Sequence, residues 1–238
     1  MQSLMQRYFL AKHAFVCAVG TDVIVLDLKR DKYFAFERDF WEPIVRCIGG
    51  WPDQEGAHSD DTAPDGNALA HLMESGLLTD NGQEGKDATP AAVAMASSSL
   101  IEDFRIQPPA VRAGHVFVFV GAILAAMLRL RFQPIERVVA RISDRRSPQQ
   151  AQQADIATIR DLTEIFRRLR PLLFSSRDHC LFESLALLNF LSHYGIQPTW
   201  VFGVTAAPFS AHCWLQSGQV ACNDPLDQIR RYTPIMVV

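Results

Sequence analysis

The sequence predicts an α+β protein in which a small strand-rich module precedes a larger, helix-rich domain. Three short apolar runs lie between residues 13 and 36, whereas helical periodicity prevails across residues 100–194. Charge divides the chain in the same way. Residues 1–100 carry 8 Lys+Arg against 15 Asp+Glu, and residues 101–238 carry 15 against 11, all fifteen of them arginine. Such an asymmetry indicates two domains.

The N-terminal module reads as three strands followed by two short helices. AFVCAV (14–19) and VIVLDL (23–28) flank a tight turn that begins at Gly20, and YFAF (33–36) follows the charged turn KRDK. A helix over 39–48 is expected, with Pro43 tolerated only in its first turn. A second helix is expected over NALAHLMESG and should stop at Gly76. This order is typical of a small winged-helix-like module.

A compositional break separates the two parts. Residues 79–99 are rich in Gly, Ser, Asp and Ala and poor in large apolar residues, which favours a linker. We therefore expect a module over 1–80, a linker over 81–99 and a second domain over 100–238.

The second domain is expected to begin with helices and to end with strands. Helices are predicted at 100–104, 116–131, 134–142, 154–169 and 180–194, the last ending at Gly195. The following segments, TWVFGV, AHCWLQ and VACND, have the alternation of strands.

Composition excludes several classes of function. The arginines are not clustered with aromatic residues, so no nucleic-acid partner is expected. No secretory signal opens the chain, and an odd number of cysteines (five) indicates reduced thiols in the cytoplasm. The longest apolar run, 116–128, is shorter than a bilayer crossing and indicates a buried segment, with a membrane-surface role as the alternative. No cofactor or metal is expected, since a zinc site at His212, Cys213 and Cys222 would need unusual spacing and a fourth ligand.

One cysteine stands at the start of a predicted apolar helix. Ser175, Ser176 or Asp178 can cap this helix, which places Cys180 in its first turn. Unpaired backbone N–H groups and the helix dipole favour the thiolate there. Cys180 is therefore a candidate nucleophile, although a small residue filling space at a helix start is the alternative.

A candidate base and a candidate orienting carboxylate follow on neighbouring strands. Strand alternation places His212, Trp214 and Gln216 on one face and Cys213 and Leu215 on the other. Across the Ser217-Gly218 turn, Asp224 can come alongside His212 and hold its ring. A helix-borne Cys, a strand-borne His and a third polar residue follow the chain order of papain-like and transglutaminase-like cores. The other four cysteines are expected to be structural.

The C-terminal part resembles the maturation protease of lasso peptide biosynthesis, the B protein, a transglutaminase-like cysteine peptidase. The resemblance rests on RDHCLFESLALLNFLSHYGI, FGV, AHCWLQ and NDPLDQIRRYTPI. It implies Cys180 as nucleophile, His212 as general base and acid, and Asp224 as orienting carboxylate. Asp227 is a second choice for the last role. The Cys180 backbone N–H would supply one oxyanion donor, and the second donor is not identified.

The N-terminal module resembles the leader-recognition element of enzymes that modify ribosomally made peptides, through YFLAKHAFVCAV and VIVLDLKRDKYFAF. The resemblance implies that a precursor leader peptide adds as a strand along the sheet edge and lies in a groove beside the second helix. The residues expected to bind it are Tyr33, Phe34, Ala35, Phe36, Leu69, Leu72 and Met73.

The resemblance also implies a partner, an asparagine-synthetase-like cyclase that uses ATP to join an acidic side chain to the amine freed by leader removal. This chain contains no GxxxxGK[ST] phosphate loop, so ATP use is assigned to the partner, and the sequence leaves the chain's own ATP dependence open. Two alternatives to the leader peptidase are an acyl transferase with the same triad and a non-catalytic precursor-binding module.

Overall fold

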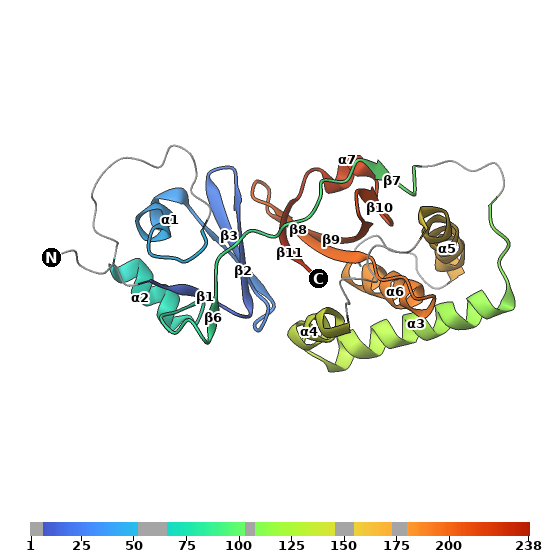
Figure 1. Cartoon of the computed structure of the whole chain (residues 1–238), viewed down its shortest axis with the longest axis horizontal. Coiled ribbons are helices and arrows are strands. Elements are labelled where there is room, and N and C mark those ends of the chain that lie inside the picture. Colours follow the sequence, from blue (N-terminus) through green and yellow to red (C-terminus); the bar gives the residue numbers. More distant parts are fainter. Residues whose placement is uncertain (1–6, 52–65, 103–107, 146–154, 173–179) are drawn as a thin grey trace. The chain divides into compact units, whose positions relative to one another are not determined.

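The structure is a computed structural model that describes residues 7–51, 66–102, 108–145, 155–172 and 180–238. The α+β class is confirmed, because the N-terminal region is rich in strands and the C-terminal region combines helices with a sheet (Figure 1). The chain divides into two compact units, one built mainly from residues 1–92 and the other mainly from residues 93–238.

The three predicted strands of the first unit are confirmed and form an antiparallel meander. The strands β2 (Ala14–Val19), β3 (Asp22–Asp27) and β4 (Lys32–Phe36) lie in the order β2-β3-β4, with Cys17 opposite Ile24 and Ile24 opposite Ala35. Gly20 has φ +61°, the left-handed conformation that the tight turn requires and that glycine adopts without steric cost. β4 is thus an edge strand of this sheet.

Two helices complete the core of the first unit, and one differs from its prediction. Helix α1 (Arg38–Val45) contains Pro43 in its second turn, so the expectation that Pro43 would lie in the first turn is wrong. Aromatic stacking supports the helix around this position, since Trp41 packs edge-on against Phe36 and stacks on Trp51. Helix α2 (Gly66–Glu74) is confirmed, and Gly76 follows it with φ +72°.

A second small sheet in this unit was not predicted. Strand β1 (Phe9–Ala11) lies between β5 (Leu78–Thr79) and β6 (Gly85–Lys86) and pairs antiparallel with both. β6 falls within the residues that composition assigned to a linker. A segment without large apolar residues can still form ladder hydrogen bonds, because the backbone supplies the donors and acceptors.

The helices of the second unit follow the predicted order. They are α3 (Ala113–Phe132), α4 (Ile135–Arg145), α5 (Ile156–Leu169), a short 3-10 helix (Arg170–Leu172) and α6 (Cys180–His193). Asp155 caps α5 by accepting from the backbone N–H of Ala157 at 3.2 Å. Helix α6 lies at the centre: Phe190 contacts Phe166 of α5, which contacts Phe119 of α3 (ring centroids 5.6 and 5.1 Å apart). The predicted helix start near Leu100 forms only a turn at 100–102, and residues 103–107 lie outside the described part of the chain.

A mixed sheet is formed mainly by the C-terminal part of the chain. In the described part of the chain its order is β11-β8-β9-β10-β7, formed by β8 (Thr199–Thr205), β9 (Ser210–Ser217), β10 (Val220–Ala221), β11 (Thr233–Val237) and β7 (Ser98–Ser99). β7 comes from the expected linker and pairs parallel with β10. Helix α7 (Leu226–Ile229) and strand β11 were not predicted, because neither has enough apolar periodicity to stand out.

Helix α3 is the most apolar surface element of this unit. It packs against α6, and Phe119 and Ala126 are among its buried residues, while Phe117, Leu128 and Phe132 remain exposed. By length and mean hydropathy the helix could cross a membrane, with 22% of its most apolar window buried.

Asp27 at the end of β3 holds the turn that leads into β4. Its fully buried carboxylate accepts the backbone N–H groups of Lys29 and Arg30 at 3.0 Å and the Arg30 guanidinium at 2.7 Å. Burial alone would raise the pKa of Asp27, but the hydrogen bonds from Arg30 and the charge of His13 lower it overall. The negative charge of this carboxylate therefore stabilises the fold.

We expect Asp27→Ala to lower the free energy of unfolding at pH 7 by about 2 kcal/mol, since several donors lose their acceptor. A carboxyl whose pKa is lowered on folding stabilises the protein above its unfolded pKa of about 3.9 and ceases to do so as pH falls through the folded value. Urea unfolding measures the difference in free energy of unfolding between the wild type and Asp27→Ala. This difference should be smaller at pH 3 than at pH 7. The exposed Asp80→Ala is the matched control, and an equal loss in that variant would contradict this role.

Candidate active site

Cys180 is the first residue of α6 and is partly exposed, at the end of the most deeply buried helix of the second unit. Leu185, Phe190 and Leu191 of this helix are fully buried, so the helix cannot shift without disturbing the core. The expected caps Ser175, Ser176 and Asp178 lie outside the described residues. A thiol on such a helix has a fixed position.

His212 and Asp224 approach each other from neighbouring segments. His212 lies in β9, and its Nε2 is 3.2 Å from Oδ1 of Asp224, which follows β10. Both side chains are mostly buried, with exposed fractions of 10% and 13%. Because Asp224 occupies Nε2, Nδ1 is the nitrogen that remains for the hydrogen bond between His212 and Cys180. The structure thus brings Cys180, His212 and Asp224 together.

The carboxylate of Asp224 is itself held in place. Its Oδ2 accepts a hydrogen bond from Nδ2 of Asn223 at 2.6 Å, and Oδ1 of Asn223 accepts the backbone N–H of Leu215 in β9 at 2.7 Å. The buried Ser99 of β7 donates its hydroxyl to the backbone carbonyl of Asp224 at 2.7 Å. These contacts orient the carboxylate toward the imidazole.

The electrostatics of the site favour a charged pair. Hydrogen bonds from Cys213 and His212, together with the positive charge of His212, lower the pKa of Cys180 to about 4 against the effect of burial. Burial opposes charge on His212, but hydrogen bonds and negative charges from Asp224 and Cys180 raise its pKa to about 10. Between these values the site holds a thiolate and an imidazolium.

The remaining thiols differ from Cys180. All five cysteines lie in the described part of the chain, and burial raises the pKa of Cys17 and of Cys222 to about 12 and also raises that of Cys47. Cys213 has a pKa raised well above the ordinary value, chiefly by its hydrogen bond to Cys180 and by burial. Reactivity is therefore confined to Cys180.

Cys213 does more than fill space in the strand. The alternation of β9 is as predicted, because the rings of His212 and Trp214 stack at 6.2 Å on one face while Cys213 is directed toward α6. There both its side chain and its backbone form hydrogen bonds with Cys180. Sequence reasoning treated Cys213 as structural because only tertiary packing brings the two thiols together.

Ser184 is a second residue that sequence reasoning missed. It is fully buried one turn after Cys180, where it accepts a hydrogen bond from Nε1 of Trp200 at 2.9 Å and donates to the carbonyl of Cys180 at 2.7 Å. Its hydroxyl also lies 3.3 Å from Sγ of Cys213. A serine inside an apolar run was the available signal, since a buried hydroxyl needs a partner.

Two further polar residues border the triad. Gln228 of α7 lies with Nε2 3.4 Å from Nε2 of His212, and Glu183 in the first turn of α6 forms an ion pair with Arg170. Asp227, the alternative third residue, is exposed on α7, and the carboxylate that contacts His212 is that of Asp224. No group of three metal-ligating side chains stands together within the described ranges.

The residues expected to bind a leader peptide fall into two groups. Tyr33, Phe34, Ala35 and Phe36 lie on the edge strand β4 and are partly or fully exposed. Leu72 is fully buried, Leu69 nearly so, and Met73 remains partly exposed, so Leu69 and Leu72 belong to the core beneath the surface. One aromatic contact of β4 is with α1, where the rings of Phe36 and Phe40 stack at 5.0 Å.

The charged pair predicts an unusual pH dependence of alkylation. Because the pKa of Cys180 is about 4, its reaction with iodoacetamide should be nearly independent of pH between 5 and 8, whereas an ordinary thiol slows about tenfold for each unit of pH below its pKa of about 8.5. His212→Ala should slow the reaction at pH 6 at least tenfold. Peptide mapping by mass spectrometry identifies the modified residue, with Cys17 and Cys222 as unreactive internal controls. A midpoint near 8.5 in the wild type would exclude the ion pair.

The hydrogen bonds between Cys213 and Cys180 predict a smaller change in the pH dependence of Cys180 alkylation. Cys213→Ala removes one donor to the thiolate, so the pKa of Cys180 should rise above about 4. Cys213→Ser retains a hydroxyl donor, so the pKa of Cys180 in this variant should stay closer to the wild-type value. Identical alkylation profiles for the wild type and Cys213→Ala would show that the side chain of Cys213 does not stabilise the thiolate.

Comparison with known proteins agrees with this geometry. No curated protein and no solved structure matches the chain significantly. Residues 122–237 match the model of the transglutaminase-like superfamily, which includes cysteine peptidases and acyltransferases and in which cysteine-based catalysis is common. These residues include Cys180, His212 and Asp224, so the part of the chain that carries the triad is similar to transglutaminase-like domains.

Proposed function

We propose that the protein is a cysteine peptidase that removes the leader from a lasso peptide precursor. The observation that carries the proposal is the thiolate–imidazolium pair of Cys180 and His212, with Asp224 3.2 Å from the imidazole. Such a pair is the starting state of acyl transfer by a cysteine nucleophile. The N-terminal module with its edge strand β4 is the proposed means of holding the precursor.

The proposed reaction begins with attack of the Cys180 thiolate on the carbonyl carbon at the junction between leader and core. The C–S bond forms, and the carbonyl oxygen becomes an oxyanion toward which the backbone N–H of Cys180 can donate. The imidazolium of His212 then gives its proton to the departing amine, and the C–N bond breaks. The core peptide leaves with a free amine, and the leader remains as a thioester.

Hydrolysis completes the cycle. His212, now neutral, takes a proton from water, whose oxygen attacks the thioester carbonyl. The C–S bond breaks, the leader leaves as a free acid, and the thiolate and imidazolium are restored. Asp224 acts throughout as the group that orients His212 and stabilises its charged form.

Leader capture is proposed to use the edge of β4. An extended peptide can add to an edge strand through backbone hydrogen bonds, and partly exposed aromatic side chains such as Phe34 and Phe36 can receive its apolar residues. Phe40 of α1 stacks on Phe36, and Met73 of α2 packs partly exposed on the same core, so both can widen this surface. Leu69 and Leu72 would then support it from below.

The proposal includes a partner and a compartment. The freed amine would be the substrate of an asparagine-synthetase-like cyclase that supplies the ATP-dependent ring closure. Reduced cysteines suit a cytoplasmic site of action. The second candidate reaction is acyl transfer to an amine instead of water. It is supported by the match of residues 122–237 to the model of a superfamily that includes acyltransferases.

The deciding experiment is incubation of the purified protein with its precursor peptide, with and without the cyclase, followed by mass spectrometry. The wild type should release an intact leader carrying a free carboxylate, whereas Cys180→Ala should release none. Asp224→Asn should lower kcat at least tenfold, because the amide no longer stabilises the imidazolium. Asp227→Asn on the adjacent helix, where the carboxylate is exposed, is the matched control.

The products distinguish the alternatives. A leader joined to an amine would identify the acyl transferase. Leader binding without cleavage by the wild type, measured by fluorescence anisotropy, would instead make the chain a precursor-binding module. Replacing Phe34 with Asp on β4 should weaken that binding while leaving iodoacetamide alkylation of Cys180 unchanged.

A further inference from the structure

A cavity of about 650 Å³ lies among α3, α4 and α6, away from the triad. Its wall on α6 includes Leu188 and Asn189, eight and nine residues after Cys180, which corresponds to about 12 Å along a helix. A volume of this size is typical of sites for small organic ligands. The chemistry at Cys180 does not use this cavity.

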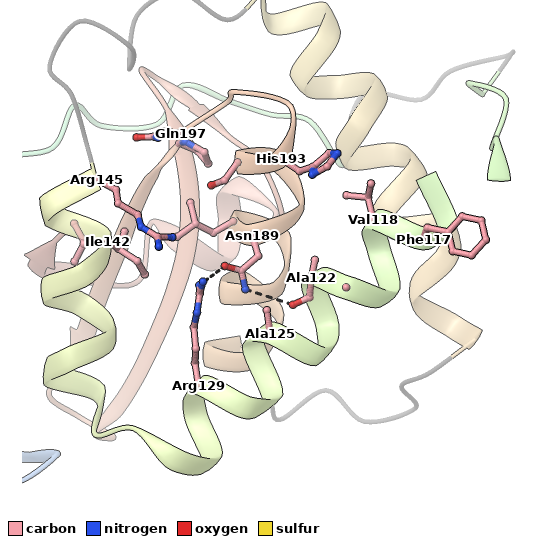
Figure 2. A pocket seen from close by; sticks show the side chains of 15 residues that line it. Phe117, Val118, Ala122, Ala125, Arg129, Ile142, Arg145, Asn189, His193 and Gln197 are labelled. Carbon is pink, nitrogen blue, oxygen red and sulfur yellow. Dashed lines mark hydrogen bonds between the residues drawn. The ribbon is translucent and has the colours of Figure 1, made fainter. Parts of the chain in front are cut away.

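Two arginine side chains converge in the cavity. Figure 2 shows Arg129 of α3 and Arg145 of α4 extending toward each other across the space between the helices. Burial and the positive charges of Arg145 and Arg141 lower the pKa of Arg129. Among the described residues, neither Arg129 nor Arg145 forms an ion pair with a carboxylate. An anion between the two guanidinium groups would relieve their repulsion.

Asn189 holds one of these arginines in place. Its Oδ1 accepts a hydrogen bond from Nη1 of Arg129 at 2.5 Å, and its Nδ2 donates to the carbonyl of Ala122 at 3.4 Å (Figure 2). Both hydrogen bonds join the Asn189 side chain of α6 to α3. The guanidinium is therefore preorganised, which lowers the entropic cost of binding a ligand there.

The rest of the wall is largely apolar. Val118, Ile142 and Leu188 line the cavity beside the polar groups. Phe117 also lines it and is 78% exposed, and the apolar face of α3 continues outside through Leu124 and Leu128. A ligand that matches this surface has a charged end and an apolar body.

We propose that the cavity binds an organic anion with an apolar body, whose carboxylate or phosphate group lies between Arg129 and Arg145. The apolar part packs against the wall formed by α3 and Leu188. A free single-chain amphiphile and an anionic membrane lipid share this chemistry, and the exposed face of α3 can receive the acyl chain of either. This site is separate from the peptide-processing function proposed above.

Binding is tested with four probes and the full-length protein. Dodecanoate and dodecyl phosphate, below their micellar concentrations, carry both required features, and dodecanol carries only the apolar body. The fourth probe is a pair of phosphatidylcholine vesicle preparations, with and without phosphatidylglycerol. Calorimetry measures the soluble probes, and co-sedimentation measures the vesicles.

Glycines in α3 provide a matched pair of variants. A Cβ atom at Gly121, which lines the cavity, would meet nothing within 4 Å, and the same holds for Gly114, which does not line it. Gly121→Leu should therefore place a side chain in the cavity without strain. Gly114→Leu should leave the cavity unfilled. Leucine is a better helix former than glycine, so both variants should melt at or above the wild-type temperature.

We expect dodecanoate or dodecyl phosphate to bind at least tenfold more tightly than dodecanol. Arg129→Gln and Arg145→Gln should each weaken binding of the anionic probes at least tenfold. Gly121→Leu should abolish this binding, whereas Gly114→Leu should retain it. If only the phosphatidylglycerol vesicles bind, with the same response to these variants, the ligand is a membrane lipid. Equal binding of dodecanol, unchanged binding by Gly121→Leu, or no binding of any anionic probe would overturn the proposal.

Discussion

The ion pair between the Cys180 thiolate and the His212 imidazolium is the interaction on which the rest of the site depends. It joins the first residue of α6 to the third residue of β9, and Asp224 extends it to the segment after β10. Each of these three elements must therefore hold its position to within the length of a hydrogen bond. The largely buried α6 meets this demand on one side, and the sheet meets it on the other.

Buried polar contacts explain how that precision is reached. Trp200 of β8 donates to Ser184, and Ser184 donates to the backbone of Cys180, so the helix start is bonded to the sheet. On the opposite side Asn223 connects β9 to the carboxylate of Asp224. A buried polar group without a partner costs free energy, so these contacts specify one arrangement of helix and strand. The same contacts thus serve both folding and the readiness of the site for chemistry.

The two units differ in whether their proposed functional residues already contact one another. In the second unit the reactive groups are in contact, with the pKa of Cys180 about 4 and that of His212 about 10. In the first unit β4 is the last strand of its sheet, and the buried Asp27 fixes the turn that positions it. An edge strand acquires its specificity from the peptide that pairs with it. A residue such as Phe34 therefore has a less defined role in the proposed leader capture than His212 has in the triad.

The sequence by itself determined the α+β class, the three strands before residue 37, the main helices and the order of Cys180, His212 and Asp224. These features follow from apolar periodicity, from glycines at turn positions such as Gly20 and Gly76, and from strand alternation around His212, all of which are local. Only the tertiary structure decided that Cys213 contacts Cys180, that Ser184 connects α6 to Trp200, that Leu72 is core, and that Arg129 and Arg145 share a cavity. The same is true of β6 and β7, which join sheets from a segment of linker-like composition. Each of these depends on which distant segments pack together, and no local pattern carries that information because side-chain and backbone partners are chosen by the fold as a whole.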